Sequence, residues 1–178
     1  YFTHAARTSF YRRAIDRVSA LPGVQAAGGV TSLPLGGTPG RGSFTIEGRS
    51  LDVGNVPVSE ASIVTPGYFR ALGVELVRGR LLADDDDDRA PLAVVVSESF
   101  ARQFLAGEDA VGRRLAFGGG GRPPGPQPTP ISWLTIVGVV RDVKSARLEA
   151  SPAPLLYRSL FQASNLNLTL VVRTKNDP

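Results

Sequence analysis

The sequence contains no cysteine and only one histidine in its 178 residues. The absence of cysteine excludes disulfides, thiolate nucleophiles and cysteine-ligated zinc ribbons, but it leaves the compartment open because many envelope proteins also lack cysteine. The single histidine, His4, lies near the amino-terminal end, and no G-x-S-x-G motif is present. A Ser-His-Asp triad therefore has no credible base, and we expect His4 to be an exposed terminal side chain.

Long hydrophobic runs are also missing. The best apolar run, residues 133–140, is strand-sized and contains Gly138. It falls short of the roughly 18 to 20 residues that a helix needs to cross a bilayer, so the chain is not expected to span a membrane. Methionine is absent and the first residue is Tyr1. We therefore expect a piece of a longer protein, from which a membrane helix could have been cut on either side.

Hydrophobic residues make up 42% of the sequence, which is enough to fill the core of one ordinary domain or of two small lobes. The formal net charge is +4 and the isoelectric point is about 10.0. The arginines are nevertheless scattered along the chain and do not gather on one predicted element. Nucleic acid is therefore not expected as a partner.

Hydrophobic periodicity predicts few helices and many strands. The longest helix is expected over residues 5–21, with Pro22 and Gly23 ending it, and another is expected to begin at Ser97. Strands are predicted at residues 24–30, 43–47, 58–65, 74–78, 92–96, 113–117, 131–143, 155–158 and 166–174. This order does not follow a regular βαβ alternation, so the predicted class is α+β with mixed or antiparallel sheets.

The segment "TPGYFRALG", residues 65–73, predicts a short helix. Thr65 is suited to cap its first turn, Pro66 sits where a missing N–H costs little, and Gly73 supplies the left-handed residue that ends it. Aromatic side chains in and beyond this segment are expected to anchor the core. They are Tyr68, Phe69, Phe104 and Trp133.

Five consecutive aspartates, residues 84–88, are the first candidate for a functional site, because clustered carboxylates can hold calcium or magnesium. A calcium loop starting at Asp84 would place Arg89 where the turn needs glycine and Val95 where a bidentate glutamate belongs. A calcium loop that starts one or two residues later also lacks the glycine of the turn. Adjacent like charges repel, and exposure to water relieves that repulsion. The run is therefore predicted to be a solvated turn without a bound metal.

The remaining candidates are equally weak. The glycine-rich segment 37–43 lacks the lysine of a phosphate-binding loop and continues as a strand where a helix N-terminus is needed. Residues 118–130 are rich in glycine and proline, precede no helix, and are expected to form a mobile hairpin loop. Asp142, after the strand "IVGVV", is interpreted as a turn residue or an ion pair beside Arg141. No catalytic residue, cofactor site or metal ligand is predicted.

Several short phrases occur in an order that resembles one family. They are "LPGV" at 21–24, "LPL" at 33–35, "IEGR" at 46–49, "TPGYFRALGVELVRGR" at 65–80, "VVVSESFARQF" at 94–104, "VGRRL" at 111–115, "IVGVVRDVK" at 136–144 and "LYRSL" at 156–160. Together they resemble the MacB-like periplasmic core domain of ABC transporter permeases, particularly the orphan-permease branch. The resemblance covers essentially the whole chain, and none of its phrases is catalytic.

The resemblance implies a porter-like α/β lobe formed by residues 1–65 and 163–178, with a β-rich, Sabre-like lobe, residues 66–162, inserted between them. It implies a non-enzymatic extracytoplasmic domain that transmits the motion of a cytoplasmic ATPase, without a cofactor. The implied partners are the flanking transmembrane helices, the indirectly coupled ATPase and an envelope protein. The implied signature positions are structural, and they are Pro66, Gly67, Tyr68, Phe69, Leu72, Gly73, Gly79, Arg80, Gly138 and Asp142.

Two features depart from the family pattern. The segment 118–130 is longer than a tight hairpin, and the sequence stops at Pro178, where the family continues with a helix leading toward the membrane. We therefore expect the porter-like lobe to be incomplete. Two other functions stay open at this point: a stand-alone binding module for an envelope ligand, and an acid-dependent hydrolase that uses Asp142 and the aspartate run.

Overall fold

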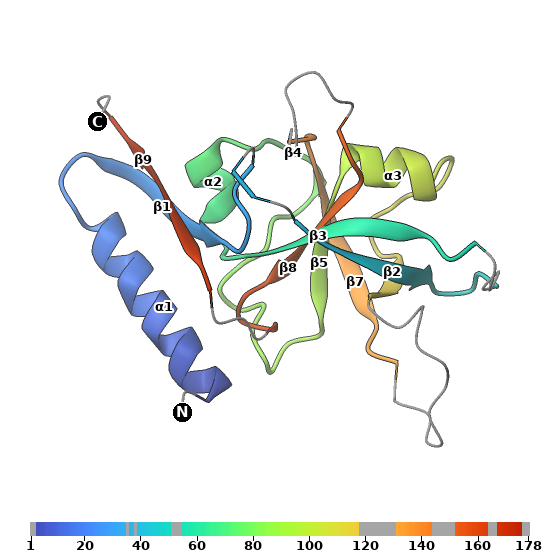
Figure 1. Ribbon diagram of the computed structural model, residues 1–178, viewed down its shortest axis with the longest axis horizontal. Coiled ribbons are helices and arrows are strands. Elements are labelled where there is room, and N and C mark those ends of the chain that lie inside the picture. Colours follow the sequence, from blue (N-terminus) through green and yellow to red (C-terminus); the bar gives the residue numbers. More distant parts are fainter. Residues whose placement is uncertain are drawn as a thin grey trace.

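The computed structural model describes residues 3–34, 36–37, 39–50, 55–117, 131–143, 152–163 and 167–175. Strands dominate the described part, three helices lie around them, and the predicted α+β class is confirmed (Figure 1). The elements are α1 (His4–Ser19), β1 (Val24–Val30), β2 (Gly40–Ile46), β3 (Val58–Val64), α2 (Tyr68–Leu72), β4 (Leu76–Gly79), β5 (Ala93–Ser97), α3 (Glu98–Phe104), β6 (Arg114–Phe117), β7 (Leu134–Val140), β8 (Leu155–Ser159) and β9 (Thr169–Thr174).

Six strands close into a small barrel in the order β2-β6-β7-β5-β8-β3, because β2 also pairs with β3. The β5–β7 and β3–β8 pairs are parallel and the other pairs of the ring are antiparallel, as the predicted mixed sheet requires. The strand β4 adds to β7 outside the ring. Because the ring is closed, β2 and β3 pair with each other and do not leave two open edges of the sheet.

The barrel interior follows from the alternation of side chains along each strand. Val94 and Val96 of β5 point inward with Leu156 of β8, and Phe100 of α3 packs into the same cluster. The N-terminus of α3 forms as the sequence predicts, because the Ser97 hydroxyl accepts a hydrogen bond from the N–H of Phe100 at 3.3 Å.

A second core covers the outer face of β5 and β8. Tyr68 and Phe69 of the short helix α2 are fully buried there, and the Phe69 ring centroid lies 5.1 Å from that of Tyr157 on β8. The two rings predicted to anchor the core in α2 are therefore confirmed. Trp133 is only half-buried and lies just before β7, so the same prediction was wrong for Trp133.

Thr65 acts differently from the predicted helix cap. Gly67 precedes the first residue of α2 without any side-chain cap, while the Thr65 hydroxyl accepts a hydrogen bond from the N–H of Gly29 at 2.9 Å. The tertiary bond to β1 has replaced the local cap, because Thr65 is buried between the two elements. The glycine stop is confirmed: Gly73 has a φ of 75°.

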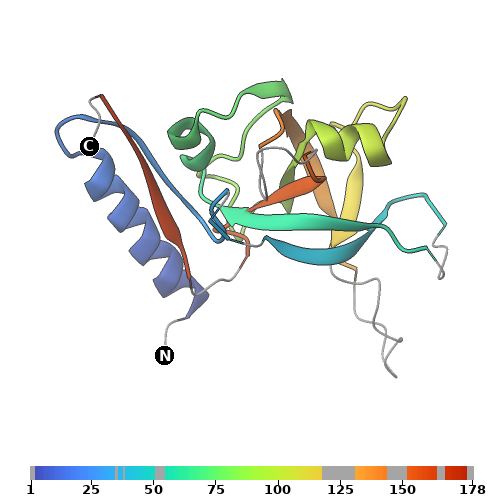
Figure 2. The ribbon, with the colours of Figure 1, turned by 45° about the horizontal axis from the view of Figure 1, so that its top comes forward.

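The strands β1 and β9 leave the barrel side by side, and α1 lies along them (Figure 2). The strand β1 also pairs with β3, so a continuous sheet links this part to the barrel. The whole of α1 is described, and none of its residues is buried. Because β2 and β3 belong to the barrel ring, the division into lobes at residues 65 and 163 stays a prediction.

The described part of the chain contains no helix long and apolar enough to cross a membrane. Most strand predictions agree with the structure within a few residues, although β2 begins at Gly40, three residues earlier than expected. The loop predicted at residues 118–130 lies outside the described residues.

Candidate functional site: the aspartate turn between α1 and the barrel

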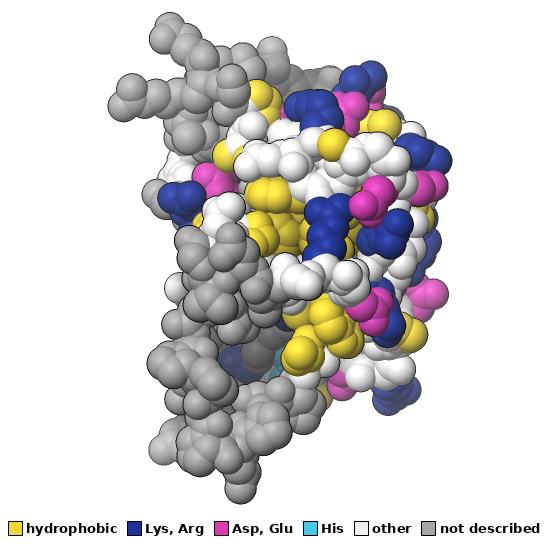
Figure 3. Space-filling view, turned by 90° about the vertical axis from the view of Figure 1, so that its right-hand side faces the viewer, with side chains coloured by type: hydrophobic (Ala, Val, Ile, Leu, Met, Phe, Trp, Pro, Cys, Tyr) yellow, Lys and Arg dark blue, Asp and Glu magenta, His cyan; other side chains and the backbone are white. Residues whose placement is uncertain are grey.

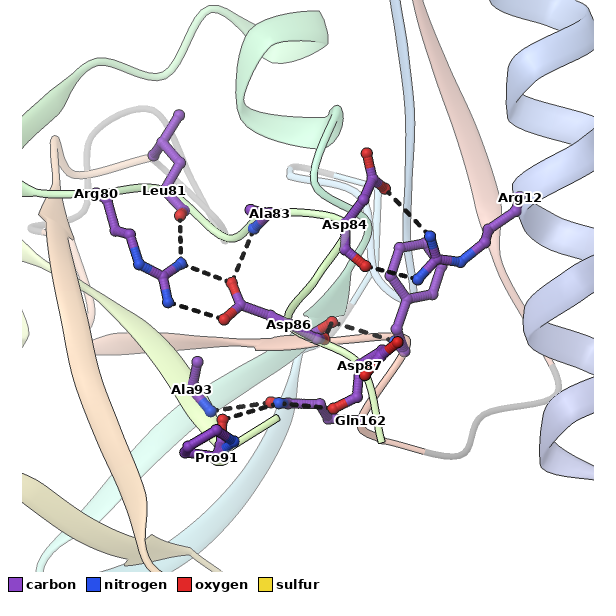
Figure 4. Close-up of polar contacts among 12 residues, drawn as sticks. Arg12, Arg80, Leu81, Ala83, Asp84, Asp86, Asp87, Pro91, Ala93 and Gln162 are labelled. Atoms are coloured by element: carbon purple, nitrogen blue, oxygen red, sulfur yellow. Dashed lines mark hydrogen bonds and ion pairs between the residues drawn. The ribbon is translucent and has the colours of Figure 1, made fainter. Parts of the chain in front are cut away.

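The five aspartates lie on a turn between β4 and β5, and they do not share one environment. Figure 4 shows Asp84, Asp86 and Asp87 of this run. Asp86 is buried, with 3% of its surface exposed, whereas Asp84, Asp85 and Asp88 are exposed. The predicted turn is confirmed, but the prediction that the run is solvated was wrong at Asp86. The physical reason is a partner just before the run, Arg80, which neutralises the one carboxylate that turns inward.

Asp86 accepts three hydrogen bonds. Nη1 of Arg80 donates to Oδ2 at 2.7 Å, Nη2 donates to Oδ1 at 2.8 Å, and the N–H of Ala83 donates to Oδ2 at 2.8 Å. Burial by itself would raise the pKa of Asp86, but these hydrogen bonds and the charge of Arg80 outweigh burial and hold the pKa below its usual range. Asp86 is therefore an ionised residue that closes the turn onto the end of β4.

The backbone of the turn is hydrogen-bonded to the last residue of β8 and to the segment that follows this strand. The Ser159 hydroxyl donates to the carbonyl oxygen of Asp86 at 2.9 Å. Nε2 of Gln162 donates to the carbonyl oxygen of Asp87 at 3.1 Å, and its Oε1 accepts a hydrogen bond from the N–H of Ala93 at 2.9 Å. One amide side chain therefore connects the turn to the first residue of β5.

Arg12 brings α1 to the same place. Its Nη2 donates to the carbonyl oxygen of Asp84 at 2.7 Å, and its guanidinium lies 3.8 Å from the centroid of the Phe161 ring. Nε2 of the His4 ring forms a hydrogen bond with the carbonyl oxygen of Phe161 at 3.1 Å, which is a second contact between α1 and this segment. The prediction of an exposed terminal His4 was wrong, because the helix begins at this residue and lies against the segment after β8.

Asp142 also forms structural contacts. Its Oδ1 accepts a hydrogen bond from the N–H of Ser99 at 2.7 Å, and its Oδ2 pairs with Arg102 at 2.8 Å. Burial acts to raise the pKa of Asp142, but the bonds from Ser99 and Arg102 outweigh it and lower the pKa. The ion-pair interpretation is confirmed, although the partner is Arg102 on α3 and not the neighbouring Arg141, which pairs with glutamates.

Within the described ranges, no group of three or more histidine or acidic side chains is placed to hold a metal ion. The aspartate run shows why: both oxygens of Asp86 already accept protein hydrogen bonds. The carboxylate of Asp84 lies 3.8 Å from a guanidinium nitrogen of Arg12. The run therefore carries negative charge, but its oxygens do not converge on one point as the ligands of a bound metal ion do.

We predict that calcium binds the run too weakly to matter. A site with a dissociation constant of about 1 mM would stabilise the fold by about 1.4 kcal/mol in 10 mM calcium, or roughly 3 to 6 °C in melting temperature. The expected calcium-specific shift is below about 1 °C, measured against sodium chloride of equal ionic strength. A shift of about 3 °C that vanishes when the four aspartates other than Asp86 are changed to serine would show a cation site.

A second candidate site is a hollow of about 550 Å³ beside the end of α3. Hydrophobic side chains gather on this face among arginines and acidic residues (Figure 3). Ile46, Val58 and Phe104 contribute to its lining. Arg49 at its edge is already bound to the carbonyl oxygen of Phe104 and to Glu108. The hollow therefore has a mixed polar and apolar lining, and the charge of Arg49 is already paired.

Comparison with known proteins shows to which family this architecture belongs. The family model of the MacB-like periplasmic core domain matches residues 3–177. The chain belongs to this family. A 69-residue stretch is 36% identical to the macrolide export ATP-binding/permease protein MacB of Aggregatibacter actinomycetemcomitans, covering 38% of this chain and 11% of that protein. The chain therefore spans only a small part of this relative.

Two solved structures have the fold of this MacB-like domain. The periplasmic region of MacB from Actinobacillus actinomycetemcomitans is similar with a TM-score of 0.62 and 18% identity, over 94% of this chain and 66% of that chain. The extracellular domain of the noncanonic ABC-type transporter YknZ from Gram-positive bacteria is similar with a TM-score of 0.57 and 13% identity, over 94% of this chain and 74% of that chain. At these identities the likeness shows the fold alone.

The predicted signature positions of the MacB-like domain fall into two neighbourhoods and one outlying position. Residues 66–69, 72 and 73 form α2 and its ends, where a side chain at Gly67 would overlap the carbonyl oxygen of Ala27 in β1. Gly79 pairs with Gly138 where β4 meets β7, directly before Arg80. Asp142 lies apart from both, after β7. Their role as a family signature stays a prediction.

Sequence reasoning missed three residues of the site: Arg12, Ser159 and Gln162. The signal for Arg12 was present only as a basic residue on the predicted first helix, and its partner lies 72 positions further along the chain. Ser159 and Gln162 are isolated polar residues near the end of a strand and carry no spacing pattern. Only the packing of β8 against β5 brings them to the turn.

Asp86 should make the stability of the domain depend on acid pH. Its lowered pKa in the fold means that it contributes stability above the ordinary carboxyl pKa of about 3.9, and that this stability is lost as the pH falls through the lower folded value. We expect the free energy of unfolding to fall more steeply below about pH 4 in the parent than in Asp86→Asn. Denaturant titrations at several pH values measure this slope.

The matched control is Asp88→Asn, which removes one charge from the exposed part of the run. This variant should retain most of the acid dependence of the parent. Equal slopes for the parent and Asp86→Asn would contradict the prediction, since they would mean that the Arg80 pair adds nothing to the stability of the fold.

Proposed function

We propose that this MacB-like domain is a non-catalytic extracytoplasmic part of an ABC-type permease, and that it transmits ATP-driven conformational change to substrate or partner handling in the envelope. The match of the family model over residues 3–177 is the observation that carries the proposal. The fold likeness to the periplasmic region of MacB and to the extracellular domain of an ABC-type transporter supports it.

The non-catalytic part of the proposal is supported by how the candidate catalytic side chains are used. Both carboxylate oxygens of Asp86 accept hydrogen bonds from Arg80 and Ala83, and both carboxylate oxygens of Asp142 accept hydrogen bonds from Ser99 and Arg102. Each carboxylate has a lowered pKa, whereas a general acid must stay protonated at the working pH and therefore needs a pKa near or above it. These carboxylates therefore hold the fold together, which argues against the acid-dependent hydrolase.

The mechanical part of the proposal is supported by the arrangement of the two parts of the molecule. The helix α1 and strands β1 and β9 form one part, and the barrel with α3 forms the other (Figure 1). The short helix α2 lies between them, against β1 and β9 and against Tyr157 of β8. A barrel joined to a smaller α/β part can pass a displacement between a membrane-side element and an outer surface. The proposed partners are the transmembrane helices of the same permease, its indirectly coupled cytoplasmic ATPase and an envelope protein.

The experiment is hydrogen exchange of residues 3–177 within the complete permease, without nucleotide and with ATP plus vanadate. We expect exchange in this domain to change with the nucleotide state, although the nucleotide binds on the other side of the membrane. Identical exchange in both states would contradict mechanical transmission. A stand-alone binding module would instead change its exchange only when an envelope ligand is added.

A further inference from the structure

The helix α1 touches the barrel side of the molecule at the aspartate turn and at the segment after β8. Arg12 reaches the carbonyl oxygen of Asp84 and covers the Phe161 ring, and His4 reaches the Phe161 carbonyl oxygen. Figure 4 shows Arg12 extending from the helix to the turn. No residue of α1 is buried, so packing alone holds this helix less firmly than the helices α2 and α3, which have buried residues.

The turn that receives Arg12 is anchored far more strongly than α1. Its side toward the barrel contains the buried carboxylate of Asp86, which is paired with the partly exposed Arg80, and the bonds from Ser159 and Gln162. Several hydrogen bonds therefore have to break together before the turn can leave the barrel. The turn is therefore a fixed part of the barrel.

The contacts of Arg12 are weaker because its guanidinium and the carboxylate of Asp84 both reach solvent, although the Phe161 ring is buried. The side chain of Arg12 is 33% exposed, and that of Asp84 is 77% exposed at a separation of 3.8 Å. An exposed ion pair or a cation–π contact shifts an equilibrium by only roughly two- to fivefold. When α1 and the barrel are pulled apart, the contact that opens first is therefore the one made by Arg12.

We propose that Arg12 acts as a latch: its contacts hold α1 on the aspartate turn in one state of the domain and are broken in another. The carbonyl oxygen of Asp84 and the ring of Phe161 form the receiving surface, and the Asp86–Arg80 pair holds that surface in place. The use of this latch during transport rests on the proposed function, whereas its existence does not.

Because the chain has no cysteine, a spin-label pair can be introduced without removing any native thiol. The labels go on Ser9→Cys of α1 and Asp88→Cys of the turn, both exposed positions. Electron double resonance then gives the distance distribution between α1 and the turn. The parent should show one dominant short distance. Arg12→Ala removes the polar contact and the cation–π contact together, so their two- to fivefold effects multiply and should lower the ratio of docked to released populations by about tenfold.

The control variants separate the latch from general loosening. Arg13→Ala removes an exposed arginine of the same helix and should leave the distribution unchanged. Asp84→Ala keeps the backbone carbonyl and should have a smaller effect than Arg12→Ala, because the carboxylate lies further from the guanidinium than the carbonyl oxygen does. Arg12→Lys keeps the charge without the planar guanidinium and should fall between parent and alanine. Far-ultraviolet circular dichroism checks that each variant is folded.

An unchanged distribution in both Arg12→Ala and Arg12→Lys would overturn the latch. The same labels in the complete permease, with and without ATP plus vanadate, test its use. A nucleotide-dependent change of the docked fraction supports a working latch. If Arg12→Ala shifts the distances but nucleotide does not, the contact exists but is not a latch in transport. Hydrogen exchange elsewhere in the domain then decides separately whether transmission itself occurs.

Discussion

Phe69→Ala should lower the free energy of unfolding by roughly 3 to 5 kcal/mol, which corresponds to a fall of about 6 to 20 °C in melting temperature. Phe69 has no exposed surface, and its ring contacts those of Tyr68 and Tyr157 at centroid distances of 5.5 and 5.1 Å. Its loss leaves a cavity between α2 and the outer face of β8, which a five-residue helix cannot collapse to fill. Denaturant unfolding of the purified domain measures the change.

Phe10→Ala is the matched control, since it deletes the same ring from α1, where it is 58% exposed. We expect a change within about 0.5 kcal/mol for this variant. A loss of similar size in both variants would contradict the assignment of Phe69 to the core. It would indicate that Phe10 is covered in solution, for example by another copy of the chain.

Gly138→Ala should cost about 3 kcal/mol, because the new methyl group would overlap the carbonyl oxygen of Arg80. Gly138 lies where β4 meets β7, and the N–H of Arg80 donates to the carbonyl oxygen of Val137 at 2.9 Å in the same place. Backbone, and not a flexible side chain, occupies the space, so the strands must separate. Arg80 would then move relative to Asp86, and the aspartate turn would lose its anchor.

Gly40→Ala in β2 is the control for a glycine in a strand with room for a methyl group. The nearest atom, the carbonyl oxygen of Ala61, would lie 3.5 Å from the added carbon, which is an ordinary contact. We expect this variant to be neutral or stabilised by up to about 1 kcal/mol, since alanine loses less backbone freedom on folding. Equal effects of the two substitutions in denaturant unfolding would refute the close approach of β4 and β7.

The sequence by itself determined the elements whose signals are local. The glycine at position 73 adopts a left-handed conformation that only glycine takes without strain, so it ended α2 as expected. The Ser97 cap and the apolar run of β5 also act within a few residues. The spacing of the aspartates was enough to argue against a calcium loop, since such a loop is defined by residues at fixed positions.

The tertiary structure decided everything that depends on partners far apart in the chain. The backbone of the aspartate turn is held by Ser159 and Gln162, which lie 73 and 75 positions further along the chain than their partners. The surface that receives Arg12 is formed by Asp84 and Phe161. Thr65 does not cap α2 as expected, because its buried hydroxyl accepts a hydrogen bond from an N–H of β1. A buried polar group must find a partner wherever the fold places one, and sequence spacing carries no information about that place.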